Sequence, residues 1–395
     1  MNTLRRNLTV SAPDELILPM NVPAKLLMGP GPANVSPRVL AAGALPVLGH
    51  MHPEMLKIMD DIKLGLRYAF QTKNSLTFAV SGTGHCGMEA AMMNVIDPGD
   101  VILVACNGIW GERQADLGKR IGAEVRILQN PTGVSFSLSQ IEESLKTHRP
   151  SVFIMTQGES SSGVLQPMEG IGQLCHRYNS LLLVDTVASL GGVPMYTDEW
   201  GIDVIYSGSQ KVLGAPPGTA PISFNQKAWE KYSSKKTRVP SFYLDLSHLA
   251  NYWGCDGSPR RYHHTCPVNS LYQLREGLAM LAEEGIENFW ARHLAAAKSL
   301  YAGLNKLGLK LFVENEASRL PTVSAVMVPP GVDWKKLVSF VMQKYKIEIS
   351  GGLGPSAGKV WRIGLMGYNA NQENVKRVLR ALEDGLNHCR TTSRL

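Results

Sequence analysis

The sequence lacks the patterns that mark metal-binding, disulfide-rich and membrane-spanning proteins. Its 6 cysteines are widely spaced and form no C-x-x-C pair, so neither a zinc ribbon nor a disulfide framework is indicated. None of its 10 histidines belongs to an H-E-x-x-H motif, and we predict no metal site. No apolar run approaches the roughly 18 residues that span a bilayer. We therefore expect a soluble protein of a reducing compartment, with no membrane partner.

Charged side chains are few and scattered. They make up 18% of the residues, and the formal net charge is +7. The densest basic cluster, Lys235, Lys236 and Arg238, has no aromatic residues interleaved, so we expect a solvated surface there and no nucleic-acid partner. A mildly positive surface potential would favour small anionic substrates.

The length of 395 residues and the order of the apolar runs predict an α/β fold with two domains. Short apolar runs alternate with helical or loop segments: LTFAV, DVILVAC, EVRIL, SVFIMTQ, SLLLVD and DVIYSG. Fully apolar strands of this length are typical of a mainly parallel sheet covered on both faces. Further on, strands are predicted at 321–328 and 360–367. We expect an N-terminal arm at 1–24, a large domain at 25–284 and a small C-terminal α+β domain at 285–395.

A glycine-rich turn follows the first of these strands, in LTFAVSGTGHCGMEAAMMNV. Backbone amides of such a turn and the positive end of the next helix form a phosphate cradle. Gly82, Gly84 and Gly87 also match the G-x-G-x-x-G pattern of nicotinamide enzymes. That interpretation needs an acid at the end of the next strand, but the strand ends at Asn107, and Asp100 lies at its other end. We predict phosphate binding without a dinucleotide, with a purely structural turn as the alternative.

Two polar side chains follow later strands. Asp185 comes directly after an apolar run, so its carboxylate needs a cationic or hydrogen-bonding partner; capping of the next helix is the alternative. Lys211 follows the strand DVIYSG and precedes a stretch too rich in Gly and Pro to be a helix. One strand–helix–strand excursion separates the two residues, so both can open into one cleft. An amine, an acid and a phosphate cradle are what pyridoxal 5′-phosphate requires.

Two further side chains suit such a site. Trp110, in NGIWGERQ after the second strand, could stack on the cofactor ring, although buried tryptophans are more often plain core. Arg362 lies in the strand-like run VWRIGLMG, where burying a charged side chain costs free energy. A bidentate clamp on a substrate carboxylate would explain it, and an internal salt bridge is the alternative.

Long motifs across nearly the whole chain closely resemble the alanine–glyoxylate (serine–pyruvate) aminotransferase family of class V, fold-type I. They are LLMGPGP, SGTGHCGMEAA, NGIWGER, TQGESSSGVLQP, LLLVDTVASLGG, YSGSQKVLGAPPG, YWGCDGSPRRYHHT and GGLGPSAGKVWRIGLMG. The resemblance implies a mainly parallel seven-stranded sheet in the large domain. It also implies a homodimer with shared active sites, in which the N-terminal arm lies over the partner.

The resemblance also assigns roles to residues. It implies that Lys211 forms the Schiff base with pyridoxal 5′-phosphate, that Asp185 pairs with the ring nitrogen and that Trp110 stacks on the ring. The remaining implied roles are phosphate binding by Thr83, Gly84 and Gln210 with His85 beside it, ring contact by Ser160 and Val187, substrate binding by Arg362, Ser160 and Gly31, and phosphate contact from the neighbouring subunit by Tyr262 and Thr265. The family often has serine where this chain has Thr83, and a hydroxyl survives that change.

The activity implied is a ping-pong transamination from L-alanine, or L-serine, to glyoxylate, which serves glyoxylate detoxification and glycine synthesis. A relative that prefers a bulkier donor such as 3-hydroxykynurenine is the first alternative, and an NAD-dependent oxidoreductase using the glycine turn is the second. Ser393-Arg394-Leu395 is similar to the S-K-L peroxisomal address, so we expect recognition by the peroxisomal import receptor. A mitochondrial or cytosolic location is the alternative.

Overall fold

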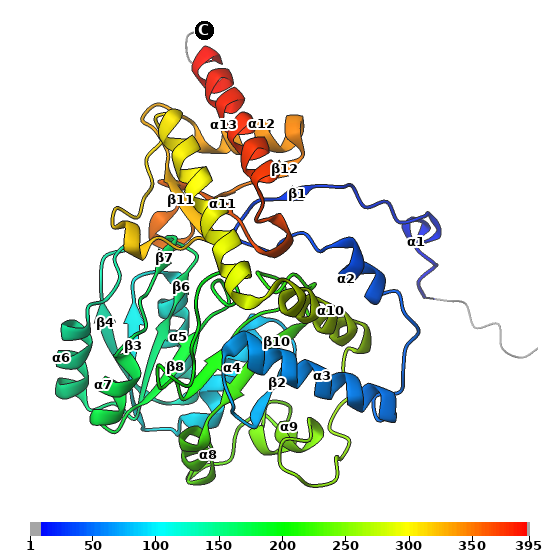
Figure 1. Cartoon of the computed structure of the whole chain (residues 1–395), viewed down its shortest axis with the longest axis vertical. Coiled ribbons are helices and arrows are strands. Elements are labelled where there is room, and N and C mark those ends of the chain that lie inside the picture. Colours follow the sequence, from blue (N-terminus) through cyan, green and yellow to red (C-terminus); the bar gives the residue numbers. More distant parts are fainter. Residues whose placement is uncertain (1–8, 393–395) are drawn as a thin grey trace, which may run out of the picture.

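The computed structural model describes residues 9–392 (Figure 1). The first eight residues of the predicted arm and the tripeptide Ser393-Arg394-Leu395 lie outside the described residues. Within 9–392, no helix is both long and apolar enough to cross a membrane. The same residues contain no cluster of three or more His, Cys, Asp or Glu side chains placed to hold a metal ion.

A seven-stranded sheet forms the centre of the larger part of the molecule. Its strand order is β2-β10-β9-β8-β5-β3-β4, and every pairing is parallel except the two made by β10. The strands are β2 (Leu76–Ser81), β3 (Val101–Cys106), β4 (Glu124–Gln129), β5 (Val152–Thr156), β8 (Leu181–Asp185), β9 (Val204–Tyr206) and β10 (Thr219–Phe224). The parallel strands end at one edge of the sheet, and the polar residues that follow them meet there.

Helices cover this sheet and complete its core. They are α3 (Pro53–Phe70), α4 (Gly84–Val95), α5 (Ile109–Ile121), α6 (Leu138–His148), α7 (Ile171–Arg177), α8 (Gln226–Ser233), α9 (Leu246–Tyr252) and α10 (Val268–Glu284). In α3, residues Met55, Met59, Ile62 and Leu66 recur at helical spacing and are all fully buried. The short hairpin β6 (Gly158–Glu159) and β7 (Val164–Leu165) follows β5.

Two sheet strands differ from the sequence prediction. β10 was not predicted, because TAPISF contains Pro221 and polar residues, yet all six of its residues are buried between β2 and β9. The run EVRIL was predicted as a strand covered on both faces, which is wrong: β4 is an edge strand, and none of its residues is buried. Because an edge strand has only one neighbour, its side chains face solvent more readily.

A second hydrophobic core lies under the antiparallel sheet β11-β14-β13 and includes Trp361, Ile363 and Leu382. The strands are β11 (Val323–Met327), β13 (Ser350–Gly351) and β14 (Val360–Gly364), so the strand predicted at 360–367 ends three residues early. The helices of this part are α11 (Ile286–Lys306), α12 (Trp334–Tyr345) and α13 (Gln372–Thr392), with short 3-10 turns η1 (Glu316–Ser318), η2 (Gly354–Ser356) and η3 (Gly367–Asn369).

The N-terminal segment joins this second core before it enters the first. β1 (Leu26–Leu27) pairs in parallel with β12 (Ile347–Glu348), and α2 (Pro37–Ala42) then packs against α10. The preceding residues, with the short α1 (Asp14–Ile17), project away from the body of the molecule (Figure 1). Apolar side chains of this N-terminal segment are exposed; Leu16 and Met20, for example, are 81% and 90% exposed.

Candidate active site

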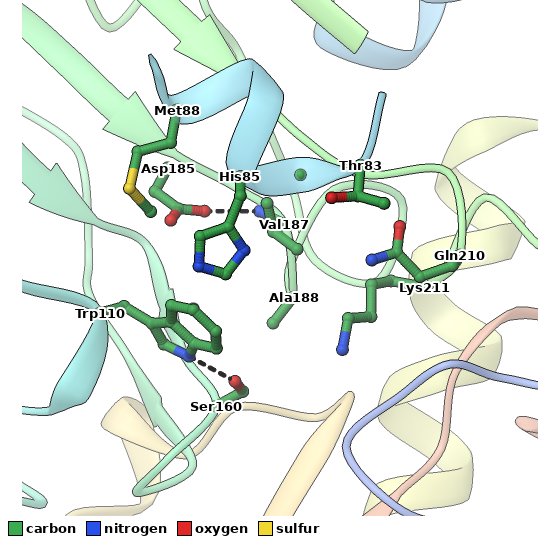
Figure 2. Close-up of a pocket in the computed structure, with 12 residues that line it drawn as sticks. Thr83, His85, Met88, Trp110, Ser160, Asp185, Val187, Ala188, Gln210 and Lys211 are labelled. Carbon is green, nitrogen blue, oxygen red and sulfur yellow. Dashed lines mark hydrogen bonds between the residues drawn. The ribbon is translucent and has the colours of Figure 1, made fainter. Parts of the chain in front are cut away.

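A cavity of about 190 Å³ opens where the parallel strands end. Nine of the residues predicted from this chain line it together: Thr83, Gly84, His85, Trp110, Ser160, Asp185, Val187, Gln210 and Lys211. Met88, Gly158 and Ala188 complete the lining. Figure 2 shows that Asp185, Trp110 and Lys211, which come from separate parts of the chain, are directed toward this common space.

Asp185 ends β8 and is only 3% exposed. One carboxylate oxygen accepts a hydrogen bond from the Val187 N–H at 2.8 Å, and the other accepts one from the Tyr206 hydroxyl at 2.7 Å. Burial raises the pKa of Asp185 to about 6, while these two hydrogen bonds and the charge of Lys211 oppose the rise. Both neighbours donate, so the pair of contacts favours the ionised carboxylate.

Lys211 follows β9 and directs its side chain into the cavity (Figure 2). Its amine donates a hydrogen bond to the carbonyl of Pro30. Burial lowers the pKa of Lys211 to about 8, and the nearby positive charge of Arg362 acts in the same direction. Gly31 lies against this side chain with a φ of +108°, and a Cβ atom there would overlap the Lys211 amine. Because the pKa of Lys211 is about 8, its neutral amine is accessible near physiological pH.

Trp110 lies near the start of α5 and is held at two points. Its indole N–H donates to the Ser160 hydroxyl at 2.8 Å, and its backbone N–H donates to Glu159 Oε2 at 3.1 Å. Glu159 is 1% exposed, and its other oxygen accepts from the backbone N–H and hydroxyl of Ser161 at 2.9 and 2.6 Å. Burial raises the pKa of Glu159 to about 7 against these hydrogen bonds. The indole therefore has a fixed position at the cavity wall.

The glycine turn presents donors that have no hydrogen-bond partner within residues 9–392. Thr83 is the N-cap of α4, but its side chain makes no capping hydrogen bond. The first N–H groups of a helix have no partner within it, so those of Gly84 and His85 remain for a ligand. Arg113 lies 2.9 Å from His85 Nε2 and donates to it, which places the proton of a neutral imidazole on Nδ1. Burial and the Arg113 charge lower the pKa of His85, which favours that neutral form.

Arg362 lies just behind the cavity wall on β14 and is 8% exposed. It donates to the carbonyls of Gly351 at 2.8 Å and Ser160 at 3.3 Å. None of the ion pairs found within residues 9–392 includes Arg362, so the internal salt bridge weighed above finds no support there. Burial lowers the pKa of Arg362, and the charge of Glu159 opposes this. A buried guanidinium that lacks an anionic partner is suited to a carboxylate ligand.

Tyr262 and Thr265 lie outside this cavity. Tyr262 is 59% exposed, and its hydroxyl is 3.4 Å from the Thr265 hydroxyl. Their contact with a neighbouring subunit stays a prediction.

Comparison with known proteins places the chain in a family. The model of the aminotransferase class-V family matches residues 40–378. The chain belongs to the class-V aminotransferases. It is similar to the alanine–glyoxylate aminotransferases of Felis catus and Callithrix jacchus, with 58% and 57% identity over 97% of this chain and 92% of each relative. The solved structure of alanine–glyoxylate aminotransferase from Nostoc sp. has a TM-score of 0.92 and 46% identity, covering 95% of this chain and 100% of that one.

These matches confirm the predicted family and the fold-type I architecture. They do not favour the nicotinamide interpretation of the glycine turn, and a class-V aminotransferase uses pyridoxal 5′-phosphate.

The residues of the cavity fit this cofactor. The uncapped start of α4 and the Thr83 hydroxyl would hold the phosphate. Gln210 has a buried amide oxygen without a partner among the described residues, so its amide is free to turn toward a ligand. Asp185 would hold the ring nitrogen, Trp110 would cover a ring face, and Lys211 would meet the aldehyde.

Sequence reasoning missed three buried polar residues around the site: Glu159, Tyr206 and Gln114. Glu159 supports Trp110, while Tyr206 and Gln114 lie behind Asp185. Tyr206 is the one hydroxyl-bearing residue of the strand VIY, but the pairing of this strand with that of Asp185 is visible only in the structure. Gln114 carries no local signal, because its partners Thr156 and Tyr206 are 42 and 92 residues away, and Glu159 was missed although its partner Ser161 is two residues away.

Proposed function

We propose that the protein transfers the amino group of L-alanine to glyoxylate, which yields pyruvate and glycine. The observation that carries this proposal is the meeting of the Lys211 amine, the buried Asp185 carboxylate and the glycine turn around one cavity. The substrate pair is supported by close relatives named alanine–glyoxylate aminotransferase. L-Serine is the second donor that we expect.

Bound pyridoxal 5′-phosphate supplies an aldehyde that takes up amino groups and a ring that stores an electron pair. Lys211 Nζ removes the substrate Cα proton, because burial makes its neutral form accessible near physiological pH. The Asp185 carboxylate would hold the proton on the ring nitrogen, since two donors keep it ionised and in place. Trp110 would keep water from one face of the ring.

The substrate carboxylate is bound by Arg362, which the carbonyls of Gly351 and Ser160 hold in position. Ser160 is itself fixed by the Trp110 indole. Gly31 lies against the Lys211 side chain, where a Cβ atom would overlap the amine. The relatives named alanine–glyoxylate aminotransferase support alanine as donor over 3-hydroxykynurenine.

The experiment is reconstitution followed by donor comparison. The purified protein with pyridoxal 5′-phosphate should absorb visible light, and borohydride reduction should attach the cofactor to the peptide that contains Lys211. Glycine formation from glyoxylate should then be fastest with alanine as donor, slower with serine, and slowest with 3-hydroxykynurenine. Failure to bind the cofactor would overturn the mechanism, whereas faster turnover of 3-hydroxykynurenine would overturn only the assignment of alanine as the amino donor.

We also propose a homodimer in which each arm lies over the partner subunit. Apolar side chains along residues 10–22 support it, because the body of their own chain leaves them exposed. An apolar hollow of about 640 Å³, lined by residues such as Leu45, Pro46 and Ile58, offers a surface that could receive them. Tyr262 and Thr265 would reach the partner's phosphate.

The domain division at residues 25–284 and 285–395 is supported by two separate hydrophobic cores, although α11 contributes Phe289 to the first and Leu300 to the second. Import into peroxisomes, and with it a role in glyoxylate detoxification there, stays a prediction. Changing Arg394 to Ala or to Lys in a fluorescent fusion and following its location would check it.

A further inference from the structure

A buried hydrogen-bond chain lies behind Asp185, on the side away from the cavity. Asp185 on β8 and Tyr206 on β9 are directly paired residues of neighbouring parallel strands. The Tyr206 hydroxyl lies 2.7 Å from Asp185 Oδ2, and Tyr206 is fully buried. It is not among the residues that line the cavity. Its hydroxyl acts on the site only through Asp185.

A second buried side chain sets the direction of this hydrogen bond. Gln114 on α5 is fully buried, and its Nε2 lies 3.2 Å from the Tyr206 hydroxyl oxygen. Because an amide N–H can only donate, it occupies a lone pair of the phenol oxygen and leaves the phenol O–H to point elsewhere. Asp185 is the acceptor within reach. The chain therefore runs in one direction, from Gln114 through Tyr206 to Asp185.

We propose that Tyr206, oriented by Gln114, is a positioning residue that keeps Asp185 ionised and directed at the ring nitrogen of the cofactor. The inference rests on the proposed function. A hydrogen bond donated to a carboxyl group stabilises its ionised form more than its neutral form, because the charged oxygen is the stronger acceptor. The other groups that face Asp185 are the Val187 N–H and Lys211, which favour the ionised form, and Glu159, whose charge opposes it.

The phenol is suited to this role because it stays a donor. Burial raises the pKa of Tyr206 well above its ordinary value, and the charge of Asp185 adds to the rise. Tyr206 therefore keeps its proton throughout the range in which the enzyme would work. A hydrogen bond to a charged group is strong enough for its loss to change an equilibrium constant about tenfold or more.

The test compares Tyr206→Phe with Tyr232→Phe. Tyr232 donates to Asp245 at the same distance, 2.7 Å, in a phenol–carboxylate pair outside the site. Both variants are loaded with pyridoxal 5′-phosphate carrying ¹⁵N in the ring. We expect Tyr206→Phe to weaken cofactor binding about tenfold or more and to shift the ¹⁵N signal toward the unprotonated ring. Tyr232→Phe should leave both measurements within about twofold of the parent.

A second variant covers the case in which Tyr206→Phe does not fold. Gln114→Met keeps the shape but removes the donor, so Tyr206 loses its fixed direction, and we expect a smaller shift of the ¹⁵N signal in the same direction. An unchanged ¹⁵N signal and affinity in the folded variants would overturn the proposal. If the parent protein itself does not bind the cofactor, the proposed function fails instead, and the two failures are thereby distinguished.

Discussion

Burial determines how Lys211 reacts. Because burial and Arg362 lower its pKa to about 8, the amine is mainly protonated below that pH and mainly neutral above it. Only the neutral amine attacks an aldehyde. We therefore predict that the cofactor-free protein captures pyridoxal 5′-phosphate faster as the pH rises through about 8, as measured by stopped-flow absorbance. A lysine with its ordinary pKa would instead require a pH near 10.5, and Lys211→Ala should show no covalent capture at any pH.

The guanidinium of Arg362 supplies geometry as well as charge. Arg362→Lys keeps the charge but cannot bind both oxygens of a carboxylate while also donating to the Gly351 and Ser160 carbonyls. We predict that the KM for alanine rises about tenfold or more, while cofactor affinity stays near that of the parent. Arg319→Lys is the matched control, because Arg319 also donates to two backbone carbonyls but lies elsewhere. Equal KM values for the two variants would contradict the assignment.

At the residue scale, the sequence predicted the groups that face the cavity better than the groups behind it. Lys211 and Asp185 each follow an apolar strand, so a position at the sheet edge could be inferred from local pattern alone. The contacts that tie Glu159 to Trp110, Tyr206 to Asp185 and Gln114 to Tyr206 join residues 21 to 92 positions apart. Such contacts depend on strand order, which the sequence pattern does not specify.

At the scale of elements, Glu159 connects the hairpin strand β6 to the start of α5. Its carboxylate accepts hydrogen bonds from the Trp110 and Ser161 N–H groups and from the Ser161 hydroxyl. Glu159→Gln would turn an amide NH₂ toward one of these donors. We predict a loss of about 2 kcal/mol in the free energy of unfolding, measured with urea, together with weaker cofactor binding.

The control for Glu159→Gln is Glu142→Gln. Glu142 accepts hydrogen bonds from Arg177 and Tyr178, but its side chain is 39% exposed. Water can replace its lost contacts, so we expect a change of no more than about 1 kcal/mol. A similar loss of unfolding free energy in both variants would mean that burial does not make the hydrogen bonds of Glu159 more stabilising than those of Glu142.

The strands themselves show where element prediction succeeds. β5 and β8 are continuous apolar runs in the middle of the sheet, and both were predicted. β10 was missed, because Thr219, Pro221 and Ser223 interrupt its apolar pattern although tertiary packing buries them all. β4 was predicted at the correct residues, but its burial was predicted wrongly, because exposure is decided by the position of a strand in the sheet rather than by its composition.

At the scale of the whole molecule, the arm is the feature that the single chain leaves unexplained. Val10, Leu16, Ile17, Met20 and Val22 are each at least 72% exposed. Burying such side chains against a partner would contribute about 1.5 kcal/mol or more apiece. Serine at all five positions should therefore weaken the proposed dimer more than about a hundredfold, measured by sedimentation velocity across a dilution series.

The fold of each subunit should survive these substitutions, because α1 contains no buried residue. Val134→Ser with Leu138→Ser is the control: both side chains are about half exposed, at 47% and 48%, and lie far from the arm in sequence. We expect that pair to leave dimerisation unchanged. If the arm variant dimerises as tightly as the control, the apolar arm does not hold the subunits together. If it becomes monomeric and also loses cofactor affinity, the result would support the prediction that Tyr262 and Thr265 reach the site of the partner.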